Sequence, residues 1–165
     1  MQKLIKNGLI QTSEEDVLDK AFDGSLPSNS ALVPLSYFLV HTDAVLAQSN
    51  LGVWIDSDET PEDLAPYADK LTLIAINFPK FADGRGYSFA RILRERFGFT
   101  GELRAIGDVL HDQLFYLKRC GFDAFAIRED KDATAALEGL GDFSENYQAD
   151  VLQTSPLFRR RKSLA

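Results

Sequence analysis

The sequence predicts an α/β protein with a mainly parallel sheet built from βαβ units, about four core strands and helices packed around them. Short apolar runs rich in β-formers alternate with segments of helical periodicity, and those segments are long enough for the crossovers that parallel strands need. At 165 residues the chain is shorter than the roughly 200 residues of an eight-unit barrel, so we expect a smaller sheet.

We expect three parts along the chain. Residues 1–30 form a small N-terminal appendage, in which KLIKNGLIQ holds a short strand with an Asn7-Gly8 turn and DGSLPSNS is a linker. Residues 31–155 form the single α/β domain. Residues 156–165, PLFRRRKSLA, form a basic tail. Consecutive arginines usually mark a solvated terminus, with docking on a partner as the alternative.

The elements of the domain follow from local patterns. A helix is predicted for residues 34–48, where apolar residues recur near helical spacing and Pro34 suits the first turn. The strand candidates are GVWI at 52–55, TLIAINF at 72–78, ELRAIG at 102–107 and DAFAI at 123–127. Helical segments are expected at 57–71, 87–97, 109–121 and 131–153, the last with a break from Gly139 to Gly141.

The composition of the chain argues against several classes of function. The net charge of −7 and the pI near 4.8 argue against a nucleic-acid partner, because neutralising phosphates needs a basic surface. No window reaches roughly 18 apolar residues and the N-terminus has no signal-like run, so we expect a cytoplasmic protein with no membrane partner. Cys120 is the only cysteine, which excludes an intramolecular disulfide, and we expect its thiol to be buried. Arg91 and Arg94 lie opposite an apolar helix stripe and are expected to be solvated.

The position of a binding site follows from the predicted sheet. In an open parallel sheet, ligands bind beyond the carboxyl ends of the strands. The polar residues that follow the strand candidates should therefore converge at one edge: Asp56 and Asp58, Asn77, Gly107, Asp108, His111 and Asp112, and Arg128, Glu129 and Asp130. Nothing in the spacing of the carboxylates and histidines requires a metal ion, so we predict no metal site.

The predicted anion-binding site is a loop at the same edge, made by Asp83, Gly84, Arg85, Gly86, Tyr87 and Ser88. Glycines permit left-handed backbone conformations that turn several N–H groups toward one ligand, and Arg85 adds a bidentate grip on phosphate, sulfate, sulfite or carboxylate. The loop matches neither the Walker pattern nor G-x-G-x-x-G. The alternative is a structural connection between a strand and a helix.

Arg104 and Asp108 are the candidates for a catalytic role, and Arg104 is also a candidate for binding the ligand. Arg104 lies in a strand candidate with apolar flanks, and Glu102 points to the same face, so a structural ion pair is the alternative to a substrate clamp. Asp108 follows Gly107 at the predicted start of a helix, where the alternative is an N-cap or a first-turn acid.

The stretch FPKFADGRGYSFARILRERFGFTGELRAIGDVLHDQLFYLKRCGFDAF, Phe78 to Phe125, closely resembles a bacterial family catalogued as domain of unknown function 934. Weaker similarity extends over VPLSYF, LGVWI, NYQAD and PLFRRR. Members are commonly described as oxidoreductases involved in sulfite reduction. The resemblance therefore implies a process, and it carries over no established catalytic residues.

Two functions follow from this resemblance. The first is an enzyme or reductase subunit in assimilatory sulfite reduction, which binds sulfite or another small oxyanion through Arg85 and the loop amides, oriented by Arg104 and Asp108. An oxidoreductase needs an electron carrier, and its identity stays unknown because the sequence has no haem, iron–sulfur, flavin or dinucleotide signature. The second is a non-catalytic accessory module that docks on sulfite reductase or another sulfate-assimilation protein.

Overall fold

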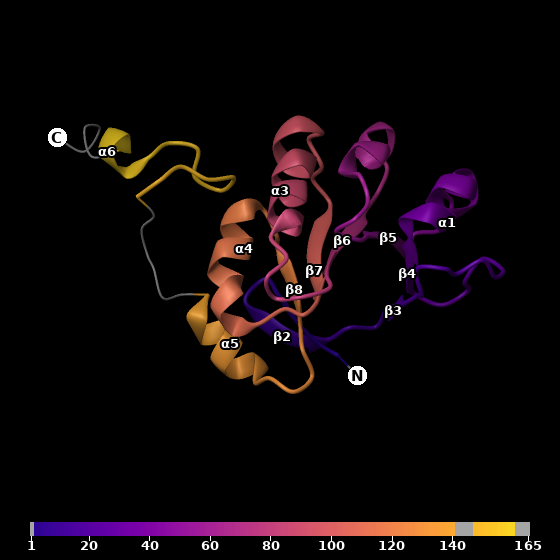
Figure 1. The fold of residues 1–165 in the computed structure, drawn as a ribbon, viewed down its shortest axis with the longest axis horizontal. Helices are drawn as coiled ribbons and strands as arrows, with labels where there is room; N and C mark the ends of the chain where they lie inside the picture. The colour runs from indigo at the N-terminus through magenta and orange to yellow at the C-terminus, as the bar shows by residue number, and fades with distance from the viewer. Residues whose placement is uncertain (1, 141–146, 161–165) are drawn as a thin grey trace.

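A computed structural model describes residues 2–140 and 147–160, and it contains one curled sheet of eight strands (Figure 1). The spatial order is β2-β1-β8-β7-β6-β5-β4-β3. Neighbouring strands from β3 to β8 run parallel, whereas β1 pairs antiparallel with both β8 and β2. The strands are β1 (Lys3–Lys6), β2 (Leu9–Thr12), β3 (Asp16–Val17), β4 (Ala31–Pro34), β5 (Leu51–Ile55), β6 (Leu73–Phe78), β7 (Glu102–Gly107) and β8 (Ala124–Ile127).

The predicted fold class, a mainly parallel sheet of about four core strands beside an N-terminal appendage, was wrong. The four predicted core strands are present as β5 to β8, and the short strand predicted in KLIKNGLIQ is present as β1 and the start of β2. These two strands, with β3 and β4, extend the sheet and make it mixed. Three of the added strands come from residues 3–17, so this segment belongs to the sheet. β3 and β4, with two and four residues, were not predicted as strands, and the pairing of β3 with β4 and of β1 with β8 depends on neighbours that are distant in sequence.

The predicted Asn7-Gly8 turn explains how the antiparallel edge forms. Both residues have positive φ, 54° and 73°, as a two-residue hairpin turn requires. The turn pairs Lys6 with Leu9 and so places β2 outside β1. Local turn chemistry thus fixes the hairpin, while the pairing of β1 with β8 brings the chain start beside its last strand.

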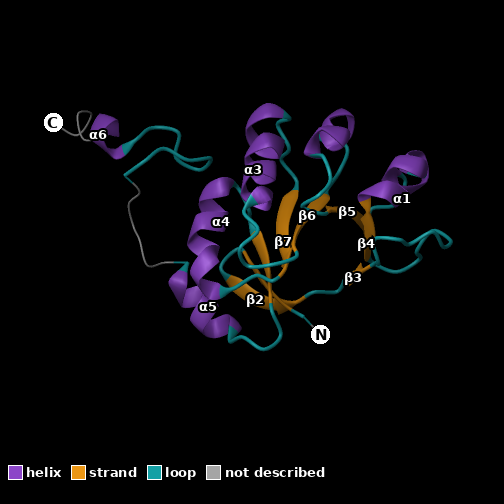
Figure 2. Cartoon of the chain, viewed as in Figure 1, coloured by secondary structure: helices purple, strands orange, loops and turns teal. Residues whose placement is uncertain are grey.

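Apart from α6, which stands away from the sheet, the helices lie along the outside of the curl (Figure 2). Strands taken in sequence order from β3 to β8 are also neighbours in space, and right-handed crossovers then place every connection on the same face. The helices are α1 (Leu35–Val40), α2 (Thr42–Leu46), a 3-10 helix Pro61–Tyr67, α3 (Arg85–Arg91) continued by a π-helical turn Ile92–Arg96, a 3-10 turn His111–Gln113, α4 (Leu114–Cys120), α5 (Ala133–Gly139) and α6 (Leu157–Arg160).

Three of these helices differ from their predicted extent. The helix expected at 34–48 is divided at His41 into α1 and α2, and its first residue belongs to β4. The helix expected at 131–153 is limited to α5. Residues 141–146 of that range lie outside the described residues, and residues 147–153 form bends. None of the helices in the described part of the chain is long and apolar enough to cross a membrane.

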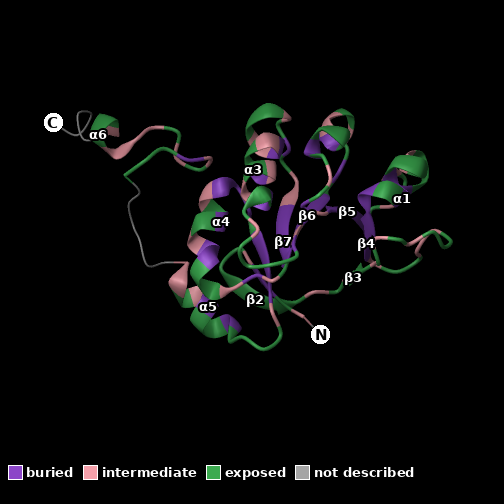
Figure 3. Ribbon diagram, in the orientation of Figure 1, coloured by how far each residue is buried: buried purple, intermediate pink, exposed green. Residues whose placement is uncertain are grey.

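Most of the sheet between β4 and β8 is buried (Figure 3), and its two faces bury different side chains. The outer face packs against the helices in the larger core cluster, which includes Val53, Ile74, Leu103 and Phe125. The inner, concave face is lined by a second cluster: Leu4, Leu32, Trp54, Leu73, Ala75, Ile106, Ala124 and Ala126. Residues 13–18 close this concave face, because Glu15 reaches Arg104 on β7 and the Trp54 Nε1–H donates to the Leu18 carbonyl.

The Arg94 side chain is only 13% exposed and its contacts are structural, so the predicted solvation of this side chain was wrong. Its guanidinium donates to three backbone carbonyls and one carboxylate: Phe99, Gly101, Gly121 and Asp123. Arg91, on the neighbouring turn, is half-exposed and pairs with Glu95. Carbonyls left unpaired at element ends need donors, and only the folded arrangement brings Arg94 to them.

Candidate functional site

The carboxyl ends of β5 to β8 lie at one edge of the sheet, which we call the carboxyl edge. Asp56 begins this edge after β5, and the Asn77 amide of β6 donates to its Oδ1 over 3.0 Å. The Lys20 ammonium binds Asp56 over 3.0 Å and also binds Asp58. Burial raises the pKa of Asp56, but the hydrogen bonds from Lys20, Asn77 and the Ser57 N–H outweigh burial and leave it below its usual value.

Arg85 is held at this edge by its own loop. The Asp83 carboxylate accepts from the Arg85 backbone N–H, from Nε at 3.0 Å and from Nη2 at 2.7 Å. Nη2 also donates to the Ser57 hydroxyl over 3.0 Å, which joins the loop to β5. These bonds hold the pKa of Asp83 well below its usual range and raise the pKa of Arg85. The Arg85 charge is therefore already neutralised by a neighbour.

The two glycines of the loop do not adopt the left-handed conformation on which the anion-site prediction was based. Gly84 has φ of −85°, and neither Gly84 nor Gly86 is among the residues with positive φ. A Cβ on Gly86 would lie 2.6 Å from the Phe78 ring, so this position is needed for packing α3 against β6. A Cβ on Gly84 would meet only Tyr87 at 3.8 Å. Gly86 thus has a structural function that is sufficient to explain it.

Tyr87 and Ser88 complete the loop in different ways. The Tyr87 ring packs on Phe78, with ring centroids 5.3 Å apart, and its hydroxyl accepts from the Gln113 amide over 3.1 Å. Burial raises the pKa of Tyr87. Ser88 is exposed on the first turn of α3. The loop is tied to the rest of the edge through Tyr87 and Gln113.

Asp108 is fixed by two contacts at the same edge. Its Oδ2 accepts from the Phe81 N–H at 2.9 Å and its Oδ1 from Arg128 Nη1 at 2.7 Å. The next helical turn begins only at His111, so Asp108 caps the loop after β6 instead of a helix. Arg128 also pairs with Asp130, which lowers the pKa of Asp130 to about 2.

Arg104 does not join the carboxyl edge. Its side chain, 3% exposed, points into the concave face and binds Glu15 at 2.7 and 3.2 Å and Glu102 at 2.6 Å. The Lys6 ammonium binds Glu102 at 2.5 Å and continues the cluster. Arg104 lies three residues before Gly107 at the strand end, about 10 Å along the strand. The hydrogen bond from Arg104 lowers the pKa of Glu15 to about 2.

The remaining predicted residues are dispersed. His111 and Asp112 are exposed on the 3-10 turn, and Glu129 is exposed after β8. Cys120 is buried, and burial raises the pKa of its thiol. No group of three or more His, Cys, Asp or Glu side chains within residues 2–140 and 147–160 is placed to hold a metal ion.

Sequence reasoning missed two polar residues of the site. Ser57 follows β5 between Asp56 and Asp58, so the rule that selected the aspartates also covers it. Lys20 lies in the segment that was interpreted as part of an appendage, and no local signal links it to Asp56. The site therefore includes one cation supplied across 36 residues of sequence.

The comparison with known families gives one clear result. Residues 52–158, which span β5 to α6, match the family described as Bacterial protein of unknown function (DUF934). The chain belongs to this family. No curated protein matches the chain significantly. Every described residue of the carboxyl edge except Lys20 falls within the matched region, whereas Glu15 and Lys6 of the interior cluster do not.

Proposed function

We propose that this DUF934 protein is a non-catalytic accessory module of assimilatory sulfite reduction, which docks on sulfite reductase through its carboxyl edge. The observation that supports docking is the pairing of three cations of this edge: Lys20 with Asp56 and Asp58, Arg85 with Asp83, and Arg128 with Asp108 and Asp130. Exposed ion pairs of this kind give a protein interface its orientation and specificity. The resemblance of residues 78–125 to described sulfite-reduction proteins supports the process.

The contacts of the two catalytic candidates favour docking over turnover. Arg104 is enclosed by Glu15 and Glu102 on the concave face, away from the loop. Both carboxylate oxygens of Asp108 already accept hydrogen bonds, one from the Phe81 N–H and one from Arg128. A group that exchanges protons with a substrate must lie within hydrogen-bonding distance of it. The hydrogen bonds of these two side chains are made to other residues of the protein.

Binding to purified sulfite reductase tests the proposal directly. The dissociation constant is measured by biolayer interferometry with the intact chain and with Arg85→Glu, which places a like charge beside Asp83. We expect at least a tenfold loss of affinity for this variant. Lys70→Glu makes the same charge change at an exposed residue before β6, at the amino end of the strands, and should bind as wild type does. Absence of binding at micromolar concentrations, or equal losses in both variants, would reject docking through this edge.

A second function, binding of a small oxyanion, is favoured by one observation. The Arg85 side chain is 57% exposed, and its Nη1 makes no hydrogen bond to any residue that the structure describes. A guanidinium nitrogen in this position is able to bind one oxygen of sulfite beside the Asp83 pair. Sulfite titration by calorimetry tests this, and Arg85→Ala should abolish the heat of binding without changing the circular dichroism spectrum. An unchanged sulfite affinity in that variant would rule out the site.

A further inference from the structure

A C-terminal arm, residues 147–160, leaves the body of the molecule after a single anchored turn. Asp150 is buried and accepts from Arg119 Nε of α4 over 3.0 Å, while the Val151 N–H donates to the Arg119 carbonyl. The Asp150 carboxylate also accepts from the N–H groups of Leu152 and Gln153, which closes the turn. Beyond this point the arm extends from the helices to α6 (Figure 1).

The arm exposes large apolar side chains. Tyr147, Leu152 and Phe158 are exposed, Phe158 at 52%, and α6 has no buried residue. Scattered exposed apolar residues are ordinary, but several within one short segment outside the core mark an interaction surface. These exposed apolar side chains of the arm are therefore able to contact another molecule.

The charge of the arm opposes the charge of the body. Residues 147–160 contain one aspartate and two arginines, a formal charge of +1, and in the sequence Arg161 and Lys162 follow directly. Because the whole chain carries −7 and residues 147–165 carry +3, residues 1–146 carry −10. Opposite net charges attract a basic arm to the acidic body of another copy.

The opposite end of the molecule carries a matching hollow, which we call the α1 groove. It has a volume of about 250 Å³ and is lined by Lys20, Ala21, Phe22, Asp23, Ser36, Tyr37, Val40 and His41. The rings of Phe22 and Tyr37 pack at 5.1 Å, and Val40 at the rim is 77% exposed. Asp19 and Asp23 are exposed close by, whereas Lys20 is already bound by Asp56. The groove thus combines an apolar floor with an acidic rim.

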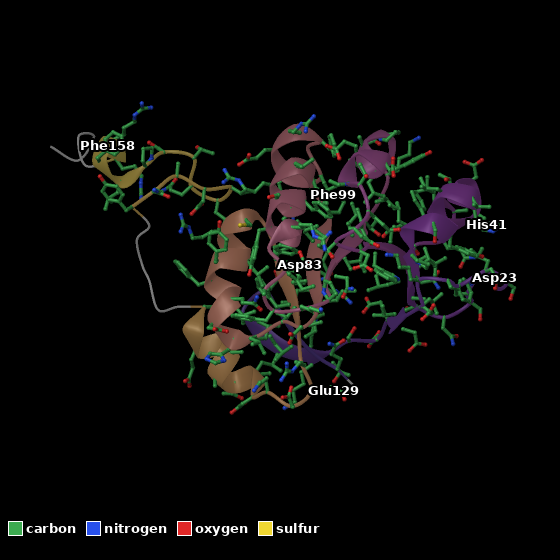
Figure 4. The ribbon with its side chains drawn as sticks, in the orientation of Figure 1. Asp23, His41, Asp83, Phe99, Glu129 and Phe158 are labelled. Atoms are coloured by element: carbon green, nitrogen blue, oxygen red, sulfur yellow. The ribbon has the colours of Figure 1, made fainter. Side chains whose placement is uncertain are left out.

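We propose that the arm of one copy docks in the α1 groove of a second copy. Phe158 and the groove residues His41 and Asp23 lie at opposite ends of the molecule (Figure 4). Two copies placed side by side in opposite directions therefore make the contact twice, which closes a two-fold dimer. The Phe158 ring fills the hollow beside Val40, and Arg159 pairs with Asp23. The groove shares Lys20 with the carboxyl edge, but the contacts proposed here are made by Val40 and Asp23, so this inference does not depend on the proposed function.

The mass of the intact chain in solution tests the proposal. Size-exclusion chromatography with light scattering should give twice the chain mass of 18.4 kDa at micromolar concentration, and added salt should shift the equilibrium to monomer. Phe158→Ala should weaken dimerisation about tenfold or more. Leu9→Ala removes a comparably exposed apolar side chain from β2 and should leave dimerisation unchanged.

A charge exchange makes the test specific for the two surfaces. Arg159→Glu and Asp23→Lys should each weaken the dimer, and the double variant should recover it because the pair is restored with reversed signs. A monomer at all concentrations, or a dimer unaffected by these changes, overturns the proposal. Binding of the arm to anionic vesicles or to nucleic acid without self-association also overturns it, because the partner of the arm would then be a different class of molecule.

Discussion

The protein contains two clusters of ion pairs that differ in their surroundings. On the concave face, Arg104 is 3% exposed and is enclosed by Glu15 and Glu102. At the carboxyl edge, Arg85 is 57% exposed and is paired with Asp83. Both arginines make two or more hydrogen bonds to carboxylates, so the local contacts alone would suggest similar roles.

Burial separates the two roles. Around Arg104 there is little water to replace a lost partner, so each member of the interior cluster depends on the others for its charge compensation. Around Arg85 solvent screens the charges, and the pair contributes little to stability. The interior cluster therefore holds the N-terminal segment across the sheet, while the edge cluster remains available for binding.

The largest effect is expected from Arg104→Met, which leaves Glu15 without its cation and leaves Glu102 with Lys6 alone. Loss of one partner from a buried ion pair costs about 3 to 5 kcal/mol. Urea unfolding followed by circular dichroism measures the loss. Arg85→Met at the edge serves as the matched control and should leave the unfolding midpoint unchanged. Equal midpoints for the two variants would contradict the difference drawn between the clusters.

The next effect concerns the pH dependence of stability. The pKa of Glu15 falls from 4.5 to about 2 in the folded protein, so its contribution of about 3 kcal/mol is complete above about pH 4.5 and is lost as the pH falls through about 2. The advantage of wild type over Glu15→Gln in unfolding free energy should therefore shrink across this window. Asp130→Asn removes an exposed carboxylate whose pKa is also lowered to about 2, and because solvent screens its pair with Arg128, its effect on the pH profile should be smaller than that of Glu15→Gln.

A smaller effect is expected from Gly86→Ala. The added Cβ would lie 2.6 Å from the Phe78 ring, and overpacking of this kind costs about 1 to 3 kcal/mol. Gly84→Ala, where the nearest side-chain atom is 3.8 Å away, should change the unfolding free energy by less than about 0.5 kcal/mol. If both substitutions were neutral for stability and only binding suffered, the loop would be a ligand cradle instead.

The smallest effect on stability is expected from Arg85→Ala, although the electrostatics of the edge should change. Removal of the guanidinium should raise the pKa of Asp83 toward its usual 3.8, which a pH titration of its carboxyl carbon by NMR measures. The pKa of Asp130, which is held by Arg128, should stay near 2 in the same titration. A shift at Asp130 as large as that at Asp83 would show that the edge behaves as one coupled network.

Sequence reasoning identified the strand ends of the site but misjudged what its residues contact. Asp56, Asn77, Asp108 and Arg128 do lie at one edge, because parallel strands end together. Arg104 was predicted to bind the same ligand, although its side chain lies on the concave face and binds Glu15. Its partner lies 89 residues away in a segment without a recognisable pattern, and no local rule links the two.

The sequence by itself determined the elements with strong local signals: four strands, the Asn7-Gly8 hairpin turn and the helices between the strands. These depend on periodicity and on backbone preferences that a few neighbouring residues fix. Only the tertiary structure decided that residues 3–17 complete a curled, mixed sheet, that Arg104 is buried and Arg94 largely enclosed, and that Arg85 remains exposed. The physical reason is that burial and charge compensation come from residues far apart in the chain, so they exist only after the sheet has curled.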